Sequence, residues 1–359
     1  MLSIKGRLSR VFAHTKADVI AIINTGIVDS NFLYMTGFTS GIFEDSILLL
    51  KHGSATLLTS ELEYYTAVQQ KPMEMRVVKI EGRKELERIM HEHLRNRTVG
   101  INGNFLPYNY VSYIRKTGAK RIVDVGKAFT EARLVKDSGE IALMKKANRI
   151  AKRAFAQIQK YFKKGITERQ LAAQFDYLMM HNGADGPSFP TIVSFGKNAA
   201  MPHHMPDNTR LEPNSIVLID AGAKYMNYCS DLTRTFVFEP KIGSDKYARI
   251  IDIYNTVKKA QALALKEIKP GAIASAPHMA AEQYINSTNG GIYKGTFIHS
   301  LGHSIGIDVH DGLGLSKSYK FKLMPGMVFS DEPGIYIEGF GGVRIEDDVL
   351  VTKDGAEFF

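Results

Sequence analysis

The stretch IVLIDAGAKYMNYCSDLTRTFVF, residues 216–238, decides the fold of this chain. An apolar strand leads into Asp220, an Ala-Gly pair allows a turn, and Asp231 begins a second strand. An aspartate is costly to bury at the end of an apolar strand unless it is paired or bound to a metal. From this segment alone, two interpretations stay open: a pair of strand-end caps, or two ligands of a metal site.

A second stretch farther along the chain repeats this order of elements. IVLIDAG resembles MVFSDEPG, and their glycines Gly222 and Gly334 lie 112 positions apart (334 − 222). Upstream, FKKGIT resembles IKPGAI, with Gly165 and Gly271 separated by 106 positions (271 − 165). Each copy has a long helix, a glycine break, another helix and a strand with an acid, followed by a second acid. We expect an internal duplication that brings two acidic pairs to one site, with chance similarity as the alternative.

Histidines are concentrated in FIHSLGHSIGIDVHDG, residues 297–312, at His299, His303 and His310. Spacings of four and seven, with small residues between them, favour a packed turn or strand over an exposed helix. Lone histidines are often satisfied core residues. Three within one glycine-rich segment indicate a site instead.

The stretch MVFSDEPGIYIEGFGGVRIEDDVLV is expected to form a hairpin near the C-terminus. Glu332 precedes a Pro-Gly turn, and Arg344 and Glu346 lie two residues apart, so they point to the same face of a strand. An arginine beside a buried acid is suited to orienting the carboxylate. The alternative is a surface hairpin of alternating charge, and Asp347 and Asp348 are expected to face solvent in this way.

A weaker signal precedes these segments, in PSFPTIVSFGKNAAMPHH, residues 187–204. A short strand leads into a Gly/Asn turn and then into His203 and His204. Taken with the other segments, His203 is a candidate for binding a substrate carbonyl or a developing oxyanion.

Four acids and one histidine emerge as a common ligand set: Asp220, Asp231, His303, Glu332 and Glu346. Two hard divalent cations side by side need carboxylates to cancel their charge, and one imidazole completes a shell. If the five converge, the protein is a two-metal hydrolase. An acid-rich set suits Mn, and Co, Zn or Fe stay possible.

The first third of the chain carries no catalytic signature. Strands are expected at residues 19–23, a hairpin at 47–50 and 55–58, and a helix at 83–94, which together indicate an α/β domain. A helix start is expected at Asp137-Ser138, with Glu140 in its first turn. We therefore predict an α+β protein with an N-terminal domain of residues 1–125 and a catalytic domain of residues 126–359.

The composition of the chain is typical of a globular protein. The chain has 359 residues, of which 44% are hydrophobic and 23% charged, as in ordinary globular proteins. Its one cysteine, Cys229, cannot form an internal disulfide. The N-terminal segment is interrupted by charge too early for a secretory signal, and no apolar run approaches the ~20 residues of a membrane span. We expect a soluble, cytoplasmic protein.

The net charge is +9 (46 − 37), with a pI of about 9.3, which raises the prior for a nucleic-acid partner. The positive residues are spread along the chain, however, and the densest run, between Lys145 and Lys164, follows a helical pattern. A solvated helix face is the favoured interpretation, so neither nucleic acid nor a membrane is an expected partner.

At these motifs the chain resembles the pita-bread metallopeptidases, and within them the proline-specific branch of prolidases and Xaa-Pro aminopeptidases. The patterns DAG…D, HxxxHxxGxxxH, EPGIY and GGVRIEDDVLV occur in order, and NFLYMTGF (residues 31–38) is similar to the N-terminal domain of this branch. The resemblance covers nearly the whole chain. It implies a C-terminal pita-bread domain with a pseudo-twofold repeat, preceded by a smaller creatinase-type α/β domain.

The resemblance also implies roles for single residues. The four acids and one histidine above would be ligands of two divalent metal ions per subunit, with Asp231 and Glu346 bridging. Catalytic roles are implied for His203, His310 and Glu332, and substrate-binding roles for His299 and Arg344.

The activity that the resemblance implies is hydrolysis of the X-Pro bond of dipeptides by metal-activated hydroxide, in a homodimer whose substrates are small peptides with proline second. The alternatives are an Xaa-Pro aminopeptidase acting on longer peptides, and a non-catalytic binding protein on the same fold. Two positions depart from the family pattern: Phe195 stands where a small residue is usual, and His204 stands where glycine is common. Both are expected near the substrate pocket, where they would alter selectivity.

Overall fold

The computed structural model describes residues 3–359 and divides the chain into two compact units. The first unit ends at Arg133, and the second is Leu134–Phe359. The boundary expected at residue 125 lies eight positions earlier (133 − 125). The helix between the two positions, α6 (Gly126–Leu134), is tied to the first unit, because the Tyr34 hydroxyl donates to the Ala132 carbonyl and Arg133 donates to the Asn31 side chain.

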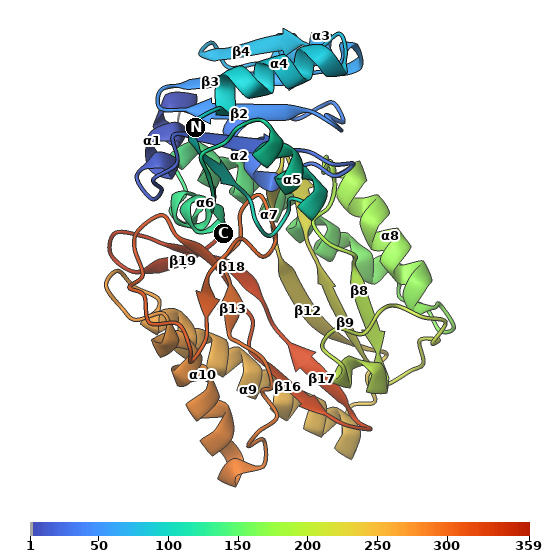
Figure 1. Cartoon of the computed structure of the whole chain (residues 1–359). Helices are drawn as coiled ribbons and strands as arrows, with labels where there is room; N and C mark the ends of the chain where they lie inside the picture. The colour runs from blue at the N-terminus through green and yellow to red at the C-terminus, as the bar shows by residue number, and fades with distance from the viewer. Residues whose placement is uncertain (1–2) are drawn as a thin grey trace. The chain divides into compact units, whose positions relative to one another are not determined.

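The first unit is built on a six-stranded sheet with the order β4-β3-β2-β1-β5-β6 (Figure 1). Its strands are β1 (Val19–Ile23), β2 (Ile47–Lys51), β3 (Ser54–Thr59), β4 (Met75–Lys79), β5 (Thr98–Ile101) and β6 (Arg121–Asp124). Before α6 its helices are α1 (Ile4–Phe12), α2 (Ser30–Thr36), α3 (Glu61–Gln70), α4 (Arg83–Leu94) and α5 (Tyr108–Lys116). All five residues of β1 are buried, as its apolar sequence requires of a central strand. The expected hairpin of β2 and β3 and the expected helix α4 are confirmed.

The first half of the second unit runs from α7 to β12. Its helices are α7 (Ser138–Ile158), α8 (Glu168–His181) and two short 3-10 helices, η1 (Gln159–Tyr161) and η2 (Gly196–Ala200). Its strands are β7 (Gly186–Pro187), β8 (Ile192–Phe195), β9 (Ser215–Ala221), β10 (Ala223–Tyr225), β11 (Tyr228–Cys229) and β12 (Leu232–Phe238). β9 lies between β8 and β12, antiparallel to both.

The second half runs from α9 to the end of the chain. Its helices are α9 (Asp245–Glu267), α10 (Ser275–Ser287) and η3 (Thr288–Gly291). Its strands are β13 (Gly302–His303), β14 (Gly314–Leu315), β15 (Val328–Asp331), β16 (Gly334–Ile337), β17 (Gly341–Arg344), β18 (Asp347–Val351) and β19 (Ala356–Phe358). β15 pairs with β18, and β16 pairs with β17, both in antiparallel register.

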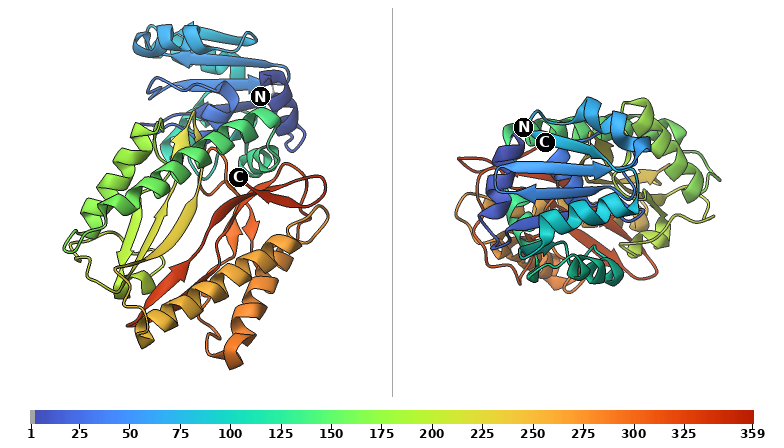
Figure 2. Two further views of the ribbon diagram at one scale, coloured as in Figure 1. Left: turned by 180° about the vertical axis from the view of Figure 1, so that it is seen from behind. Right: turned by 45° about the horizontal axis from the view of Figure 1, so that its top comes forward.

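Each half of the second unit places a pair of helices against its strands. α7 and α8 flank the strands of the first half, while α9 and α10 run along those of the second (Figure 2). Two separate apolar clusters result, one under each helix pair. Helix α7 begins as expected, because Asp137 accepts hydrogen bonds from the Gly139 and Glu140 amides in a capping box. Among residues 3–359, no helix has the length and apolarity that crossing a membrane requires.

Backbone hydrogen bonds support the expected duplication. In each half the glycine after the first long helix has a positive φ, +84° at Gly165 and +81° at Gly271, a conformation that favours glycine. Each glycine amide donates to a leucine carbonyl, and that leucine amide donates back to the residue after the glycine. The two triplets are Gly165, Leu211, Ile166 and Gly271, Leu323, Ala272. Two halves with the same long-range pairing are not explained by chance similarity of a few letters.

Candidate metal centre

Strand ends of both halves deliver the five predicted ligands. Asp220 lies on β9 one residue before its end, and Asp231 immediately precedes β12. In the second half His303 ends β13, Glu332 follows β15, and Glu346 lies between β17 and β18. The halves join at this point, since Thr233 of β12 forms an isolated bridge with Glu346. The carboxylates therefore meet at the seam between the two halves.

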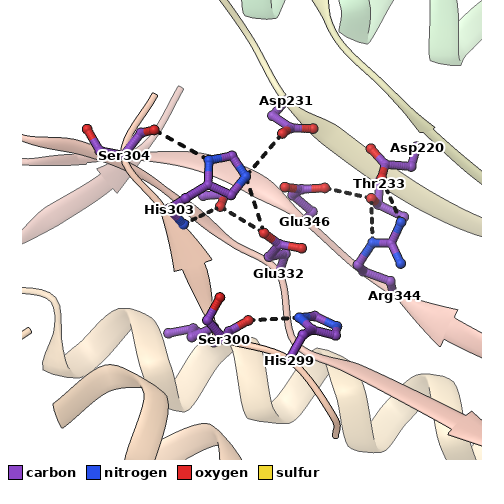
Figure 3. Close-up of polar contacts among 12 residues, drawn as sticks. Asp220, Asp231, Thr233, His299, Ser300, His303, Ser304, Glu332, Arg344 and Glu346 are labelled. Carbon is purple, nitrogen blue, oxygen red and sulfur yellow. Dashed lines mark hydrogen bonds and ion pairs between the residues drawn. The ribbon is translucent and has the colours of Figure 1, made fainter. Parts of the chain in front are cut away.

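The imidazole of His303 lies among the acids (Figure 3). Its Nε2 is 3.4 Å from Asp231 Oδ2 and 3.5 Å from Glu332 Oε1. One ligand-type atom from each of Asp231, His303 and Glu346 lies within 4.8 Å of the others, which is close enough for one cation to contact all three. The structure thus brings the predicted set together.

Four carboxylates this close repel one another when they are ionised. Burial, followed by the charges of Glu346 and Asp220, raises the pKa of Asp231 well above its usual value. Burial likewise raises the pKa of Glu346, and it raises the pKa of Glu332 to about 8. Without a positive charge beside them, burial thus favours the protonated forms of Asp231, Glu332 and Glu346.

Unsatisfied atoms in the cluster fit a pair of divalent cations. Asp220 Oδ1 and Asp231 Oδ1 are buried and find no hydrogen-bond partner among the residues that the structure describes. Burial lowers the pKa of His303 to about 3, so its ring is neutral. The ring contacts the Ser304 carbonyl through Nδ1, at 3.4 Å, which places the proton there and leaves the lone pair of Nε2 facing the acids. Open carboxylate oxygens and one neutral imidazole are the donors that such cations need.

Arg344 lies to one side of the acids, next to Asp220 and Thr233 (Figure 3). Its guanidinium donates to Asp220 Oδ2 at 2.6 Å, to the Thr233 hydroxyl at 3.0 Å and to the Tyr336 hydroxyl at 2.8 Å. Thr233 in turn donates to Glu346 Oε2 at 2.6 Å. Arg344 therefore holds Asp220 directly and reaches Glu346 through Thr233. The sequence pattern predicted that Arg344 and Glu346 share one face of a strand. It did not predict the contact between Arg344 and Asp220.

A cavity of about 320 Å³ opens over the acids. Besides His303, three histidines line it: His203, His299 and His310. Burial, and then the charge of Arg344, lowers the pKa of His299 to about 4, while burial followed by the charge of His203 lowers the pKa of His310. His299 Nε2 lies 2.9 Å from the Tyr336 hydroxyl. His299 and His310 are thus neutral at pH 7 and able to act as hydrogen-bonding groups.

Four apolar residues also line the cavity, Phe189, Ile192, Pro202 and Val309, and together they are called its apolar wall. The sequence patterns did not single out these four residues, nor Thr233 and Tyr336. Thr233 had a usable signal, because it lies two residues after Asp231 and so points to the same side of the strand. The apolar wall had none, since its members come from separate loops and strands.

The solvent-facing prediction for Asp348 is wrong. Asp348 is fully buried, accepts a 2.8 Å bond from the Asn148 amide of α7 and receives the backbone amide of Asp231 at 3.1 Å. Burial raises its pKa to about 7. The reason is that α7 covers this face of β18, so both faces of the strand are enclosed. Asp347 is partly buried and pairs with Arg234 at 2.6 Å.

Most of the chain matches known protein families. Residues 142–353 match the metallopeptidase family M24, and residues 7–135 match the creatinase/prolidase N-terminal domain. The chain is 37% identical over 312 residues to the Xaa-Pro dipeptidase of Pyrococcus furiosus, covering 86% of this chain and 85% of that protein.

The chain also resembles solved structures over nearly its whole length. The Xaa-Pro dipeptidase from Bacillus anthracis superposes with a TM-score of 0.88 at 29% identity, covering 99% of this chain and 97% of that one. The X-Pro aminopeptidase from Thermotoga maritima superposes with a TM-score of 0.87 at 30% identity, with 97% of each chain covered. These likenesses confirm the expected fold class, a pita-bread domain preceded by a creatinase-type domain.

Proposed function

This chain belongs to metallopeptidase family M24 and is a hydrolase, and from that premise we propose that it is a dinuclear-metal dipeptidase that cleaves the X-Pro bond. The observation that carries the proposal is the cluster at the floor of the cavity. There, a neutral imidazole lies among acids that have buried carboxylate oxygens without partners among the described residues, in a cavity that apolar side chains also line. The dipeptidase name of the relative from Pyrococcus furiosus supports the substrate class.

Two divalent cations would be held by Asp220, Asp231, His303, Glu332 and Glu346. When bound, such cations lower the pKa of a water molecule to near neutrality and polarise the carbonyl that the water attacks. The acid-rich donor set favours Mn, with Co and Zn as the alternatives. Arg344 would hold Asp220 and, through Thr233, Glu346 in their orientations, which favours a positioning role for this arginine over direct contact with substrate.

The remaining residues of the cavity would act on the peptide. His203 and His310 face the same space and would donate to the carbonyl oxygen before proline as negative charge develops on it. Glu332 would accept a proton from the attacking water and pass it to the proline nitrogen as the bond breaks. His299, held by Tyr336, would border the substrate.

The apolar wall supports a proline in the second position. A tertiary X-Pro amide has no N–H, so a site for it needs no acceptor at the nitrogen but needs a surface for the ring. Phe189 and Ile192 would supply that surface, because both line the cavity.

A second candidate is cleavage of longer peptides, and the likeness to the X-Pro aminopeptidase from Thermotoga maritima favours it. A non-catalytic binding role is less well supported, because all five ligand-type residues converge. The homodimer and the cytoplasmic location stay predictions.

The test compares a Met-Pro dipeptide with an X-Pro-Y tripeptide, using chelator-stripped protein to which Mn, Co or Zn is added back. Cleavage of the dipeptide alone supports the dipeptidase. Cleavage of the tripeptide at its X-Pro bond supports the aminopeptidase. No metal-dependent cleavage of either peptide would overturn both.

A further inference from the structure

A buried carboxylate outside the metal centre anchors the loop that carries His203. Glu168 is the first residue of α8 and is fully buried. Its side chain accepts four hydrogen bonds, two on each oxygen. The donors are Phe195 N at 2.7 Å, Asn198 Nδ2 at 2.9 Å, His204 Nε2 at 2.8 Å and Asp207 N at 3.0 Å. Both residues that depart from the family pattern, Phe195 and His204, therefore converge on Glu168.

The acceptor capacity of Glu168 is used up by these contacts. A carboxylate offers about four lone-pair sites, and four donors occupy them. Glu168, His204 and Asp207 lie close enough for a cation, but a cation would have to displace donors that are already in place. The cluster is therefore an anchor for the chain and not a further metal site.

The direction of the contact between His204 and Glu168 follows from its neighbour Asn198. The two amide hydrogens of Asn198 go to Glu168 Oε1 and to the Thr209 hydroxyl, 3.0 Å away. Glu168 Oε2 lies 2.8 Å from His204 Nε2 and can only accept, so His204 Nε2 carries a proton and donates it. His204 is thus a donor to a buried charge, which is among the stronger kinds of hydrogen bond.

This anchor brackets His203 on both sides. The Met201 amide donates to the Asn198 carbonyl at 3.0 Å, and the His204 amide donates to the Met201 carbonyl at 3.1 Å. His203 lies inside the turn that these bonds close, and its side chain lines the cavity. The next side chain, His204, is only 11% exposed and contacts Glu168 instead. A shift of Asn198 or His204, which Glu168 holds on either side, would move the His203 ring.

We propose that Glu168 and His204 are positioning residues that hold His203 in place for the reaction. The inference rests on the proposed function, because it takes His203 to act on the scissile carbonyl. We expect His204 to affect the reaction rate. It should not affect which residue is accepted before proline, because the His204 side chain is turned away from the cavity. Removing His204 leaves the buried carboxylate with one donor fewer, which loosens the turn.

The test is a double-mutant cycle on Met-Pro hydrolysis by the metal-loaded protein. We expect His204→Ala to lower kcat about tenfold, with KM changed less than twofold, because a displaced catalytic group costs rate more than binding. His204→Gln should recover most of the loss, since its amide can donate to Glu168. In a His203→Ala background, His204→Ala should have no further effect. His181→Ala, an exposed histidine on the same helix α8, is the matched control and should leave kcat unchanged.

A readout without substrate separates the two proposals. Ring ¹⁵N NMR of histidine-labelled protein, with His203→Ala for assignment, should show that His204→Ala shifts the His203 signals and that His181→Ala does not. If the wild type cleaves no X-Pro peptide, the proposed function fails, and unchanged His203 signals would then also overturn the positioning role. If the wild type is active, additive losses in the double mutant or full kcat in His204→Ala overturn the positioning role alone.

Discussion

The two halves of the second unit share a backbone plan and differ in what their strand ends carry. Each has a helix pair, a glycine turn with the same long-range hydrogen bonds and an antiparallel strand pair. The first half contributes two aspartates to the candidate metal centre, whereas the second contributes two glutamates and His303. The glycine turns and the strand pairing are the same in both halves, whereas the candidate ligand residues at the strand ends differ. Neither half holds a complete ligand set.

In both halves a glycine packs closely behind a candidate ligand acid, although the two glycines are not equivalent positions of the repeat. A Cβ on Gly222 would lie 1.8 Å from the carbonyl oxygen of Ser230, the residue before Asp231. A Cβ on Gly302 would lie 2.0 Å from the carbonyl oxygen of Ser330, two residues before Glu332. In each half, a glycine lets one strand approach the backbone that presents a ligand acid.

The largest expected effect comes from removing one ligand from each half in turn. Asp220→Asn and Glu346→Gln should each abolish metal-dependent peptidase activity, by more than about 100-fold, because loss of a residue that merely supports a ligand costs up to that much. Kinetics and metal content by mass spectrometry would measure it. Full activity in either variant would mean that the ligands of one half are enough for catalysis, and it would contradict the view that both halves are needed.

The packing glycines should give the next largest effect. Gly222→Ala and Gly302→Ala each place a methyl group against a backbone carbonyl that cannot rotate away, and each should cost about 3 kcal/mol of unfolding free energy. Urea denaturation of the metal-free protein measures this cost. Gly355→Ala, in the same unit, at an ordinary φ and with no atom within 4 Å of the added carbon, controls for loss of a glycine without close packing. Equal losses in all three variants would argue against the close-packing account.

Thr233 links the halves, and its removal should have a smaller effect. Thr233→Val keeps the shape of the side chain but removes the hydroxyl between Arg344 and Glu346. We expect metal affinity to fall by about 10-fold to 100-fold, with the fold intact. Metal titration by calorimetry would test this, with Thr235→Val, whose hydroxyl binds only the Arg344 backbone, as the matched variant. Similar losses in both would show that strand pairing matters, rather than the contact to Glu346.

The smallest expected effect is the pH dependence of stability. In metal-free protein the raised pKa values of Glu332, about 8, and Asp348, about 7, favour the protonated folded state. That stability is fully present below the unfolded pKa near 4 and is lost as the pH rises through 7 to 8. Melting temperature should therefore fall between pH 5 and 8 without metal. With metal, the part of the fall that comes from Glu332 should disappear, because the cations favour its ionised form, whereas the part that comes from Asp348 should stay. A metal-free melting temperature that rises over this range would contradict the crowding of acids from both halves.

The ligands could be predicted from sequence because each is marked locally, by an apolar strand that ends in an acid or by histidines among glycines. Their neighbours could not, because they depend on contacts between distant segments. Asp348 is buried by Asn148, which lies 200 positions away, and Arg344 binds Asp220 across 124 positions. His204 follows His203 directly, yet its direction is decided by Glu168, 36 positions earlier. Local pattern predicts which residues lie at strand ends, and tertiary packing decides which partner each one meets.

Because the candidate metal centre lies at the seam between the halves, its ligands are synthesised at different times on the ribosome. Asp220 is synthesised 126 residues before Glu346 (346 − 220), so at roughly 5–20 residues per second the first carboxylate waits about 6–25 s for the last. For the first 83 residues of that interval (303 − 220) the segment that bears Asp220 and Asp231 lacks His303, and for nearly all of it the segment lacks Arg344. A nascent chain arrested before Glu346 thus lacks one of the five ligands, and metal loading belongs to the end of translation or after it.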